Sequence, residues 1–403
     1  MHFATLVRSR LGLPVAGLAL AGLVTACSGG PDLSGATGGG HAGQAEQPPK
    51  PTPIIKITPA KDSTRVRPDK SVVVSVVQGT LDEVVVESGG KIIEGSFNDT
   101  RAQWTSTGPL KPSASYTVTA KASGDGTTAT ATSQFTTLKP KFPLKVADVT
   151  PNVKGETVGV GMPITVTFNQ PVKDKAAVEA ALKVDAQKPA LGAWRWISDT
   201  VVMYRTSKYW PAHQTVTVHA DLEGVHGGTD MYGVEDHEST VKIGARWVST
   251  VNTKTHMMYV KKDGKTVQTM KISAGRGTTR EYTTTSGVHL TMEAVNPVTM
   301  ISPGKKEGDP GYYKEVVNYA VRISNSGEYV HSAPWSVGSQ GHANVSHGCV
   351  NASPSQAKWF YDNFHRGDVV VVTGTTRILE WNNGWGFWQM PFKQWKKGSA
   401  LES

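Results

Sequence analysis

Short runs of alternating apolar and polar residues, separated by glycine and proline, succeed one another along the first half of this chain, and no long helical pattern interrupts them. Two of the segments resemble each other, because Thr58-Pro59 precedes an alternating run at 71–76 and Thr150-Pro151 precedes one at 163–168. The Thr-Pro pairs lie 92 positions apart, a typical length for an immunoglobulin-like domain. The pattern therefore predicts two immunoglobulin-like β-sandwiches, at residues 54–140 and 141–244.

Each predicted sandwich contains tryptophan, at Trp104 in the first and at Trp194 and Trp196 in the second. Neither contains the internal cysteine pair of antibody domains or a cluster of polar residues suited to catalysis. We therefore expect both sandwiches to act as spacers, with tryptophan in their cores. Sugar binding through exposed tryptophan is an alternative that the sequence leaves open.

A third predicted domain, residues 245–374, is rich in strands and has one main helix, so the fold class of the whole chain is mainly β. Strands are expected at 247–251, 256–260, 266–273, 288–292, 319–323, 328–331 and 369–372. The helix follows Ser353, which is a good N-cap, with Pro354 at the first helical position and Gln356 placed to close a capping box. Its apolar face is made of Ala357, Phe360, Tyr361 and Phe364.

Two further segments of this region have unusual compositions. The segment at 296–313 is a long loop rich in proline, glycine and lysine, and loops of that length within a compact domain are usually lids or disordered. The C-terminal extension at 375–403 is rich in tryptophan, glycine and asparagine, so we expect it to wrap a neighbouring surface. A platform that stacks on glycans is the alternative reading of this extension.

The N-terminus has the features of an export signal. Arg8 and Arg10 precede an apolar stretch at 11–24 that is short for a membrane span. The stretch ends in Val24-Thr25-Ala26-Cys27, which resembles a bacterial lipobox, in which the cysteine becomes the lipidated N-terminus. We therefore expect a lipoprotein signal peptide at 1–27, although an ordinary signal peptide with an incidental cysteine is the alternative. Residues 28–53, with almost no apolar side chains, are predicted to be a flexible tether.

The charge of the chain agrees with export to the cell surface. Its formal net charge of +9 suits an anionic neighbourhood such as a membrane surface or an acidic cell wall. Nucleic acid is excluded as a partner, because the cationic residues are dispersed and the chain is expected outside the cell. We expect the protein to be exported and lipid-anchored to the outer face of the cytoplasmic membrane, facing the cell wall.

Cys349 is the candidate nucleophile. The chain has two cysteines, and Cys27 is assigned to lipidation. Exported proteins usually hold their cysteines in disulfides, so a lone thiol in such a compartment points to chemistry. Because a thiol attacks carbonyl groups only as thiolate, the site needs a base beside it.

Two histidines can supply this base. His347 lies two positions from Cys349 in a tight turn, and its backbone is expected to direct the ring elsewhere. His331 ends a predicted strand, and Ser332 can hold its second ring nitrogen through the hydroxyl or the carbonyl group. Gly348 allows the backbone N–H groups of Gly348 and Cys349 to face a substrate as an oxyanion hole.

These residues also carry a family resemblance. The run Tyr329-Val330-His331-Ser332, followed by Ser346-His347-Gly348-Cys349-Val350-Asn351, resembles the signature of the L,D-transpeptidase catalytic domain, the YkuD-type fold. The resemblance covers roughly residues 245–374. Two immunoglobulin-like domains, a lipobox and a tryptophan-rich extension resemble the mycobacterial and other actinobacterial members.

The chain departs from the wider family at two places. Asn351 stands where many members carry arginine, as it does in actinobacterial members. The family's Thr-Pro-Thr-Gly turn is replaced by Thr284-Thr285-Ser286-Gly287, which leaves the contacts to the donor substrate open.

The resemblance implies a two-step acyl transfer between peptidoglycan stem peptides. Cys349 would attack the carbonyl of meso-diaminopimelate in a tetrapeptide donor stem and release the terminal D-Ala. The side-chain amine of a neighbouring acceptor stem would then resolve the thioester and give a 3→3 cross-link. His331 would serve as base and then as acid, oriented by Ser332.

Further roles follow from the same resemblance. Tyr313 is the candidate hydroxyl donor to the oxyanion, Met300 and Trp335 would line the donor channel, and His347 and Asn351 would brace the cysteine loop. Neither a metal nor a cofactor is required, and no cluster with metal-ligand spacing is visible. The resemblance also implies that carbapenem β-lactams acylate Cys349.

Two other functions stay open at this stage. If water resolved the same thioester, the protein would be an L,D-carboxypeptidase or a cysteine hydrolase. A non-catalytic wall-binding lipoprotein would rely on the sandwiches and the extension, but it has no need of a free thiol that oxidation would threaten.

Overall fold

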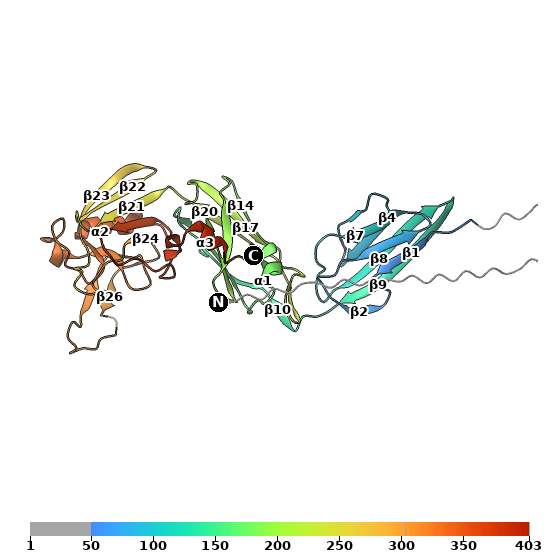
Figure 1. The fold of residues 1–403 in the computed structure, drawn as a ribbon, viewed down its shortest axis with the longest axis horizontal. Helices are drawn as coiled ribbons and strands as arrows, with labels where there is room; N and C mark the ends of the chain where they lie inside the picture. The colour runs from blue at the N-terminus through green and yellow to red at the C-terminus, as the bar shows by residue number, and fades with distance from the viewer. Residues whose placement is uncertain (1–49, 303, 403) are drawn as a thin grey trace, which may run out of the picture. The chain divides into compact units, whose positions relative to one another are not determined.

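The computed structural model describes residues 50–302 and 304–402. The predicted signal peptide with Cys27, and the predicted tether up to residue 49, lie outside the described residues. Among the described residues, no helix is long and apolar enough to cross a membrane. Strands dominate the described part of the chain (Figure 1), as expected for a mainly β fold.

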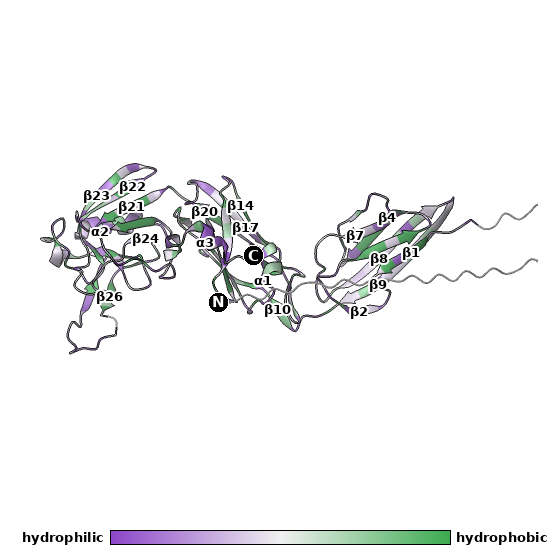
Figure 2. Ribbon diagram, in the orientation of Figure 1, coloured by the Kyte–Doolittle hydropathy of each residue, from purple (hydrophilic) through white to green (hydrophobic). Residues whose placement is uncertain are grey.

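The first sandwich packs a four-stranded sheet of order β1-β3-β7-β6 against a five-stranded sheet of order β2-β9-β8-β4-β5. The strands of the first sheet are β1 (Ile54–Thr58), β3 (Val73–Val77), β7 (Gln103–Ser106) and β6 (Gly95–Phe97). Those of the second are β2 (Ser63–Val66), β9 (Thr127–Thr137), β8 (Ser115–Gly124), β4 (Thr80–Ser88) and β5 (Lys91–Ile92). Alternate side chains of β8 are buried, as the period of a strand requires, and Figure 2 shows hydrophobic and hydrophilic residues alternating along these strands. Trp104 lies in the core.

The second sandwich has two four-stranded sheets, of order β11-β13-β16-β15 and β12-β20-β17-β14, and a small third sheet of order β10-β19-β18. The strands of the first sheet are β11 (Val146–Thr150), β13 (Ile164–Phe168), β16 (Val201–Thr206) and β15 (Gly192–Trp196). Those of the second are β12 (Thr157–Val158), β20 (His237–Ile243), β17 (Gln214–Ala220) and β14 (Leu182–Ala186). The small sheet contains β10 (Phe142–Leu144), β19 (Met231–Gly233) and β18 (His226–Gly228), and a helix, α1, spans Lys175–Ala180. Trp194 is buried and Trp196 packs against the same core, so neither Trp104 nor Trp194 offers a free face for stacking on a sugar.

The third domain is built on a nine-stranded sheet of order β24-β31-β21-β22-β23-β30-β29-β28-β25. These strands are β24 (Gly287–Leu290), β31 (Val369–Thr373), β21 (Trp247–Asn252), β22 (Met257–Lys262), β23 (Lys265–Ser273), β30 (Val350–Ala352), β29 (Tyr329–Ser332), β28 (Ala320–Arg322) and β25 (Ala294–Val295). Two of the pairings, β21 with β31 and β29 with β30, are parallel. The second of these joins the two segments that carry the candidate site residues.

Helix α2 (Pro354–Asn363) begins two residues after β30 and buries Ala357 and Phe360, as the apolar spacing predicts. Ser353 is the N-cap residue, but its side chain makes no capping hydrogen bond. Gln356 donates instead to the carbonyl of Thr269. The predicted capping box is therefore absent, because Gln356 is engaged by the neighbouring strand.

The segment expected as a loop at 296–313 is in part a β-hairpin. Strand β26 (Val298–Ile301) pairs with β27 (Lys314–Val317), and the register places Met300 opposite Glu315. Figure 1 shows this hairpin projecting from the rest of the domain. We call residues 298–317 the lid hairpin. Its inner side chains reach the candidate site described below.

The C-terminal extension packs against the second sandwich. It contains a short 3₁₀ helix, η2 (Gly386–Gln389), and helix α3 (Phe392–Lys396). Trp395 is fully buried and donates from its indole nitrogen to the carbonyl of Ala193 at 2.9 Å. Trp388 donates to the carbonyl of Gly161 at 3.0 Å. The expected packing role of the extension is confirmed. The extension covers one edge of the hydrophobic core of the second sandwich.

The second sandwich also contacts the third domain directly. Arg366 forms two hydrogen bonds with the carboxylate of Glu156, at 2.8 and 2.9 Å. At Gly159 and Gly161 the backbones approach so closely that an added Cβ would lie 2.2 Å from the nitrogen of Asp368 and 2.3 Å from Leu290. The interface thus depends on an ion pair and on close backbone contact.

We expect Trp395→Ala to destabilise the second sandwich and the third domain together. Trp395 lies in a core cluster that also contains Leu290 and Val369 of the third domain, and the substitution empties a fully buried site and leaves the carbonyl of Ala193 without its donor. A loss of about 3–5 kcal/mol is typical for such a change. Scanning calorimetry of the protein measures it, with Trp381→Ala as the matched control because Trp381 is 36% exposed. Equal shifts in melting temperature for the two variants would contradict this account.

Candidate active site

The turn that carries Cys349 is held by two hydroxyl groups. Ser346 Oγ accepts from the N–H of Gly348 at 3.1 Å and donates to the carbonyl of Cys349 at 2.6 Å. Thr284 Oγ1 donates to the carbonyl of Gly348 at 2.7 Å. Gly348 has a φ of +131°, which side chains rarely tolerate. The position of Cys349, directly before β30, is therefore fixed from both sides of the turn.

The parallel pairing of β29 with β30 brings His331 close to the thiol. The register places His331 opposite Asn351, two residues beyond Cys349, and both His331 and Cys349 line one cavity of about 70 Å³. His331 Nδ1 lies 2.9 Å from the carbonyl oxygen of Ser332. Because a carbonyl only accepts, Nδ1 carries the proton and Nε2 has the free lone pair. Of the two contacts considered for Ser332, the structure shows the carbonyl one.

The resting thiol and imidazole are both neutral. Burial lowers the pKa of His331 to about 4. Burial raises the pKa of Cys349 to about 12, although a hydrogen bond from the backbone of Tyr329 acts in the opposite direction. The thiol donates to the carbonyl of Gly327 at 3.6 Å. A proton must therefore leave Cys349 during attack rather than before it.

Two cavities meet at Cys349. The larger, of about 470 Å³, extends along the lid hairpin toward Tyr282 and Arg377. The smaller contains His331. Four residues line both: Met300, Tyr313, His347 and Cys349. A ligand can therefore approach a group bound to the Cys349 sulfur from either cavity.

The structure gathers most of the predicted site residues around these cavities. Met300 Sδ lies 4.0 Å from Cys349 Sγ. Trp335 lines the smaller cavity, with its ring centroid 6.3 Å from that of His331, and it does not line the larger one, where a donor channel was expected. Asn351 donates to Ser336 Oγ at 3.1 Å.

His347 is held between two tyrosine rings. It stacks on Tyr313 with ring centroids 4.2 Å apart and meets Tyr282 edge-on at 5.1 Å. Burial and the neighbouring Cys349 raise the pKa of Tyr313 to about 12. The phenol therefore keeps its proton and can donate a hydrogen bond at the mouth of both cavities.

Gly348 differs from the prediction. Its N–H was expected to face the substrate, yet it donates to Ser346 Oγ. The roles of Ser346 and Thr284 were missed, because each residue acts through a single hydroxyl group. Thr284 contacts the Cys349 turn only in the folded chain. Ser346, three residues before the thiol, was the one signal available in the sequence.

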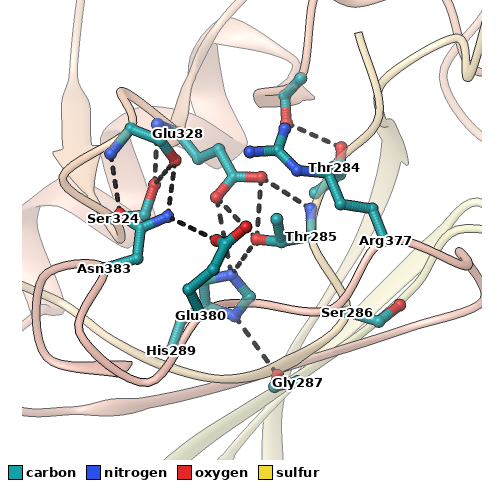
Figure 3. Close-up of polar contacts among 12 residues, drawn as sticks. Thr284, Thr285, Ser286, Gly287, His289, Ser324, Glu328, Arg377, Glu380 and Asn383 are labelled. Atoms are coloured by element: carbon teal, nitrogen blue, oxygen red, sulfur yellow. Dashed lines mark hydrogen bonds and ion pairs between the residues drawn. The ribbon is translucent and has the colours of Figure 1, made fainter. Parts of the chain in front are cut away.

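A buried carboxylate beside the thiol was also missed. Glu328 Oε2 accepts from Thr285 Oγ1 at 2.7 Å, Oε1 accepts from the Thr285 N–H at 2.7 Å, and His289 Nε2 lies 3.7 Å from Oε2. Figure 3 shows the Glu328 side chain facing Thr285 and His289. Burial alone raises the pKa of Glu328, but the hydrogen bonds and charge of His289 and the bonds from Thr285 hold that pKa below its usual value.

This network fixes the backbone that touches the thiol. Glu328 stands between Gly327, whose carbonyl accepts from Cys349, and Tyr329, whose backbone hydrogen-bonds to the same sulfur. Its N–H donates to Ser324 Oγ at 3.1 Å. Glu328 and His289 lie 39 positions apart in the sequence, so no local pattern could have joined them.

No group of three or more His, Cys, Asp or Glu side chains within residues 50–302 and 304–402 is arranged to hold a metal ion.

The chain matches two family models. That of the bacterial Ig domain covers residues 63–226, and that of the L,D-transpeptidase catalytic domain covers residues 246–372. L,D-transpeptidase 2 of Mycobacterium tuberculosis is 35% identical over 336 residues, which are 82% of this chain and 81% of that protein. L,D-transpeptidase 5 of the same organism is 33% identical over 369 residues, 89% of this chain and 79% of that one. A solved L,D-transpeptidase in complex with imipenem is 34% identical, covers 58% of this chain and 100% of its own, and has a TM-score of 0.49.

We expect the alkylation of Cys349 by iodoacetamide to be slow at neutral pH and to rise about tenfold per pH unit up to at least pH 9. The reason is that burial raises the thiol pKa, so the thiolate fraction grows across that whole range. Alkylation rates measured from pH 5 to 10 by mass spectrometry test this. A rate that levels off below pH 7 would show a preformed thiolate and contradict it.

We expect Glu328→Gln to lower the stability of the catalytic domain by about 1.5–3 kcal/mol, because both oxygens of this buried carboxylate accept from Thr285 and an amide has only one acceptor oxygen. Thermal unfolding of the protein measures the change. Glu293→Gln is the control, since the Glu293 carboxylate pairs with Arg322 at 2.7 Å but is 54% exposed, and such pairs contribute at most about 1 kcal/mol. If both variants melted like the parent, Glu328 would not be a structural anchor.

Proposed function

Because the chain belongs to the L,D-transpeptidase family, whose members cross-link peptidoglycan, we propose that it forms 3→3 cross-links through a thioester on Cys349. The observation that carries the proposal is the position of this thiol where two cavities meet, with His331 in the smaller one. Two substrates can thus reach one sulfur. A tetrapeptide stem is the donor, and a neighbouring stem is the acceptor.

In the first half-reaction the donor stem occupies the larger cavity. Cys349 Sγ attacks the carbonyl of meso-diaminopimelate while His331 Nε2 takes the thiol proton. The neutral resting pair requires these events to be coupled. The protonated Nε2 then delivers the proton to the leaving amine of D-Ala, and a thioester remains.

The oxyanion of the tetrahedral intermediate needs a hydrogen-bond donor. The Tyr313 hydroxyl is our candidate, because the residue lines both cavities and burial keeps its proton in place. The Gly348 N–H is engaged with Ser346 Oγ in the resting structure, so it contributes only if that contact opens.

In the second half-reaction the acceptor amine enters on the side of His331. One nitrogen base serves both steps, as acid for the departing D-Ala and as base for the incoming amine. By microscopic reversibility the two amines use the same path, so the smaller cavity is assigned to the leaving group and the acceptor. Trp335, 55% exposed at its rim, belongs to this side.

Carbapenem β-lactams are proposed as acylating inhibitors. They present a strained acyl group where the donor carbonyl would lie, and Cys349 can open the ring by the same attack. The L,D-transpeptidase solved with imipenem is a relative that binds such a compound.

We further propose that the protein works outside the cell, lipid-anchored through Cys27 to the outer face of the cytoplasmic membrane. The lipobox-like run before Cys27 and the net charge of +9 support this. A tether rich in glycine and proline would give the catalytic domain reach into the cell wall.

The protein incubated with a disaccharide-tetrapeptide should produce a dimer that lacks one D-Ala. Cys349→Ala should reduce this product by about a thousandfold or more, since it removes the nucleophile. Mass spectrometry of the products is the measurement, with Ser355→Ala, an exposed hydroxyl on α2, as a control.

Two other results would contradict the proposal. A tripeptide without dimer would indicate a hydrolase of the same stems. An unchanged substrate, with the protein folded and the donor present, would indicate a non-catalytic wall-binding protein.

A further inference from the structure

We infer that Glu315 of the lid hairpin binds the ammonium group of the acceptor stem and so determines which nucleophile resolves the thioester. The inference rests on the proposed function and adds to it the residue that recognises the acceptor. Glu315 is on β27, opposite Met300 in the hairpin register. It lines the same cavity as Cys349, His331 and Asn351.

Glu315 lies near the reacting groups, since it lines the cavity that contains Cys349 and His331. The negative charge of Glu315 raises the pKa of both the Cys349 thiol and the Tyr313 hydroxyl. Met300, its partner in the hairpin, contacts the sulfur at 4.0 Å. The lid hairpin therefore places an acidic group, as well as a thioether, over the nucleophile.

No cation among the described residues offsets this charge. Glu315 takes part in no ion pair or hydrogen bond with described side chains, and burial alone raises its pKa. Burying a carboxylate that has neither an ion-pair partner nor a hydrogen-bond partner costs free energy. An incoming ammonium would restore its partner with a charge-assisted hydrogen bond.

The chemistry of the acceptor fits this position. The acceptor arrives as R–NH₃⁺ and must lose one proton, which passes to His331 Nε2. The resulting amine attacks the thioester carbonyl, so that a C–N bond forms and the C–S bond breaks. A second proton moves from the nitrogen to the departing Cys349 sulfur, and His331 returns its proton to solvent.

Water, the competing nucleophile, has no charge for Glu315 to bind. The cavity beside His331 has a volume of about 70 Å³, room for about two water molecules. An ammonium held by Glu315 would displace them. Glu315 thereby favours transfer over hydrolysis by occupying the path with the acceptor.

The test compares two nucleophiles on one thioester. The protein is acylated by a donor disaccharide-tetrapeptide whose side-chain amine is acetylated. The thioester is then resolved either by a stem peptide with a free side-chain amine or by hydroxylamine, which is uncharged at neutral pH. For Glu315→Gln we expect the KM of the stem amine to rise by about tenfold to a hundredfold, the range for loss of one charge-assisted hydrogen bond. The rate with hydroxylamine should change by less than about threefold.

Two variants control for indirect effects. Glu307→Gln makes the same chemical change on the same hairpin, at an exposed position that lines neither cavity at Cys349, and it should leave the KM of the stem amine as in the parent. Glu315→Asp keeps the charge and should recover part of the affinity for the stem amine. Stoichiometric acylation of Cys349 by a carbapenem confirms that each variant has a folded site.

Each result has a separate meaning. An unchanged KM of the stem amine in Glu315→Gln, or an equal loss with both nucleophiles, would overturn the role of Glu315 while leaving the transpeptidase proposal intact. A parent protein that forms the thioester but no dimer with any stem amine would overturn the proposed function, and the inference with it.

Discussion

The parallel pairing of β29 with β30 is the constraint on which the site depends. It places His331 opposite Asn351 and so brings a base to a thiol that lies 18 positions away in the sequence. This register is strongly specified, because both strands are buried and a slip of one residue would turn every side chain to the other face. The buried Glu328 network on one side and the Ser346 turn on the other then fix the position of the Cys349 sulfur relative to His331.

The electrostatics of the site follow from burial. The same low-polarity surroundings that raise the thiol pKa also lower the imidazole pKa, so the resting pair carries no charge. A neutral thiol is less readily oxidised than a thiolate, which suits the location outside the cell that we propose. In the mechanism that we propose, the thiol becomes reactive when a carbonyl group, placed between two cavities and beside the Tyr313 hydroxyl, makes proton transfer to His331 favourable.

Much of this arrangement was predictable from the sequence, for specific reasons. The alternating strands, the two sandwiches and the helix after Ser353 follow from local patterns, and Cys349, His331 and Ser332 stand in a recognisable run. The Glu328 and His289 pair, the carboxylate of Glu315 in the cavity and the docking of Trp395 on Ala193 were not predicted. Each of these contacts joins residues from different strands or domains, so no spacing in the sequence reveals it. The hairpin register of Met300 and Glu315 was missed because the two strands are only four residues long and the segment between them is rich in proline and glycine, which is typical of a loop.

The central claim is that one thiol carries the donor stem as a thioester between the two half-reactions. Intact-protein mass spectrometry, performed after the protein is mixed with a tetrapeptide donor whose side-chain amine is acetylated so that it cannot serve as acceptor, tests this most directly. The account predicts an added mass equal to the donor minus D-Ala, mapped by peptide analysis to Cys349 and absent in Cys349→Ala. An unmodified protein that nevertheless releases D-Ala, or an adduct on any other residue, would contradict it.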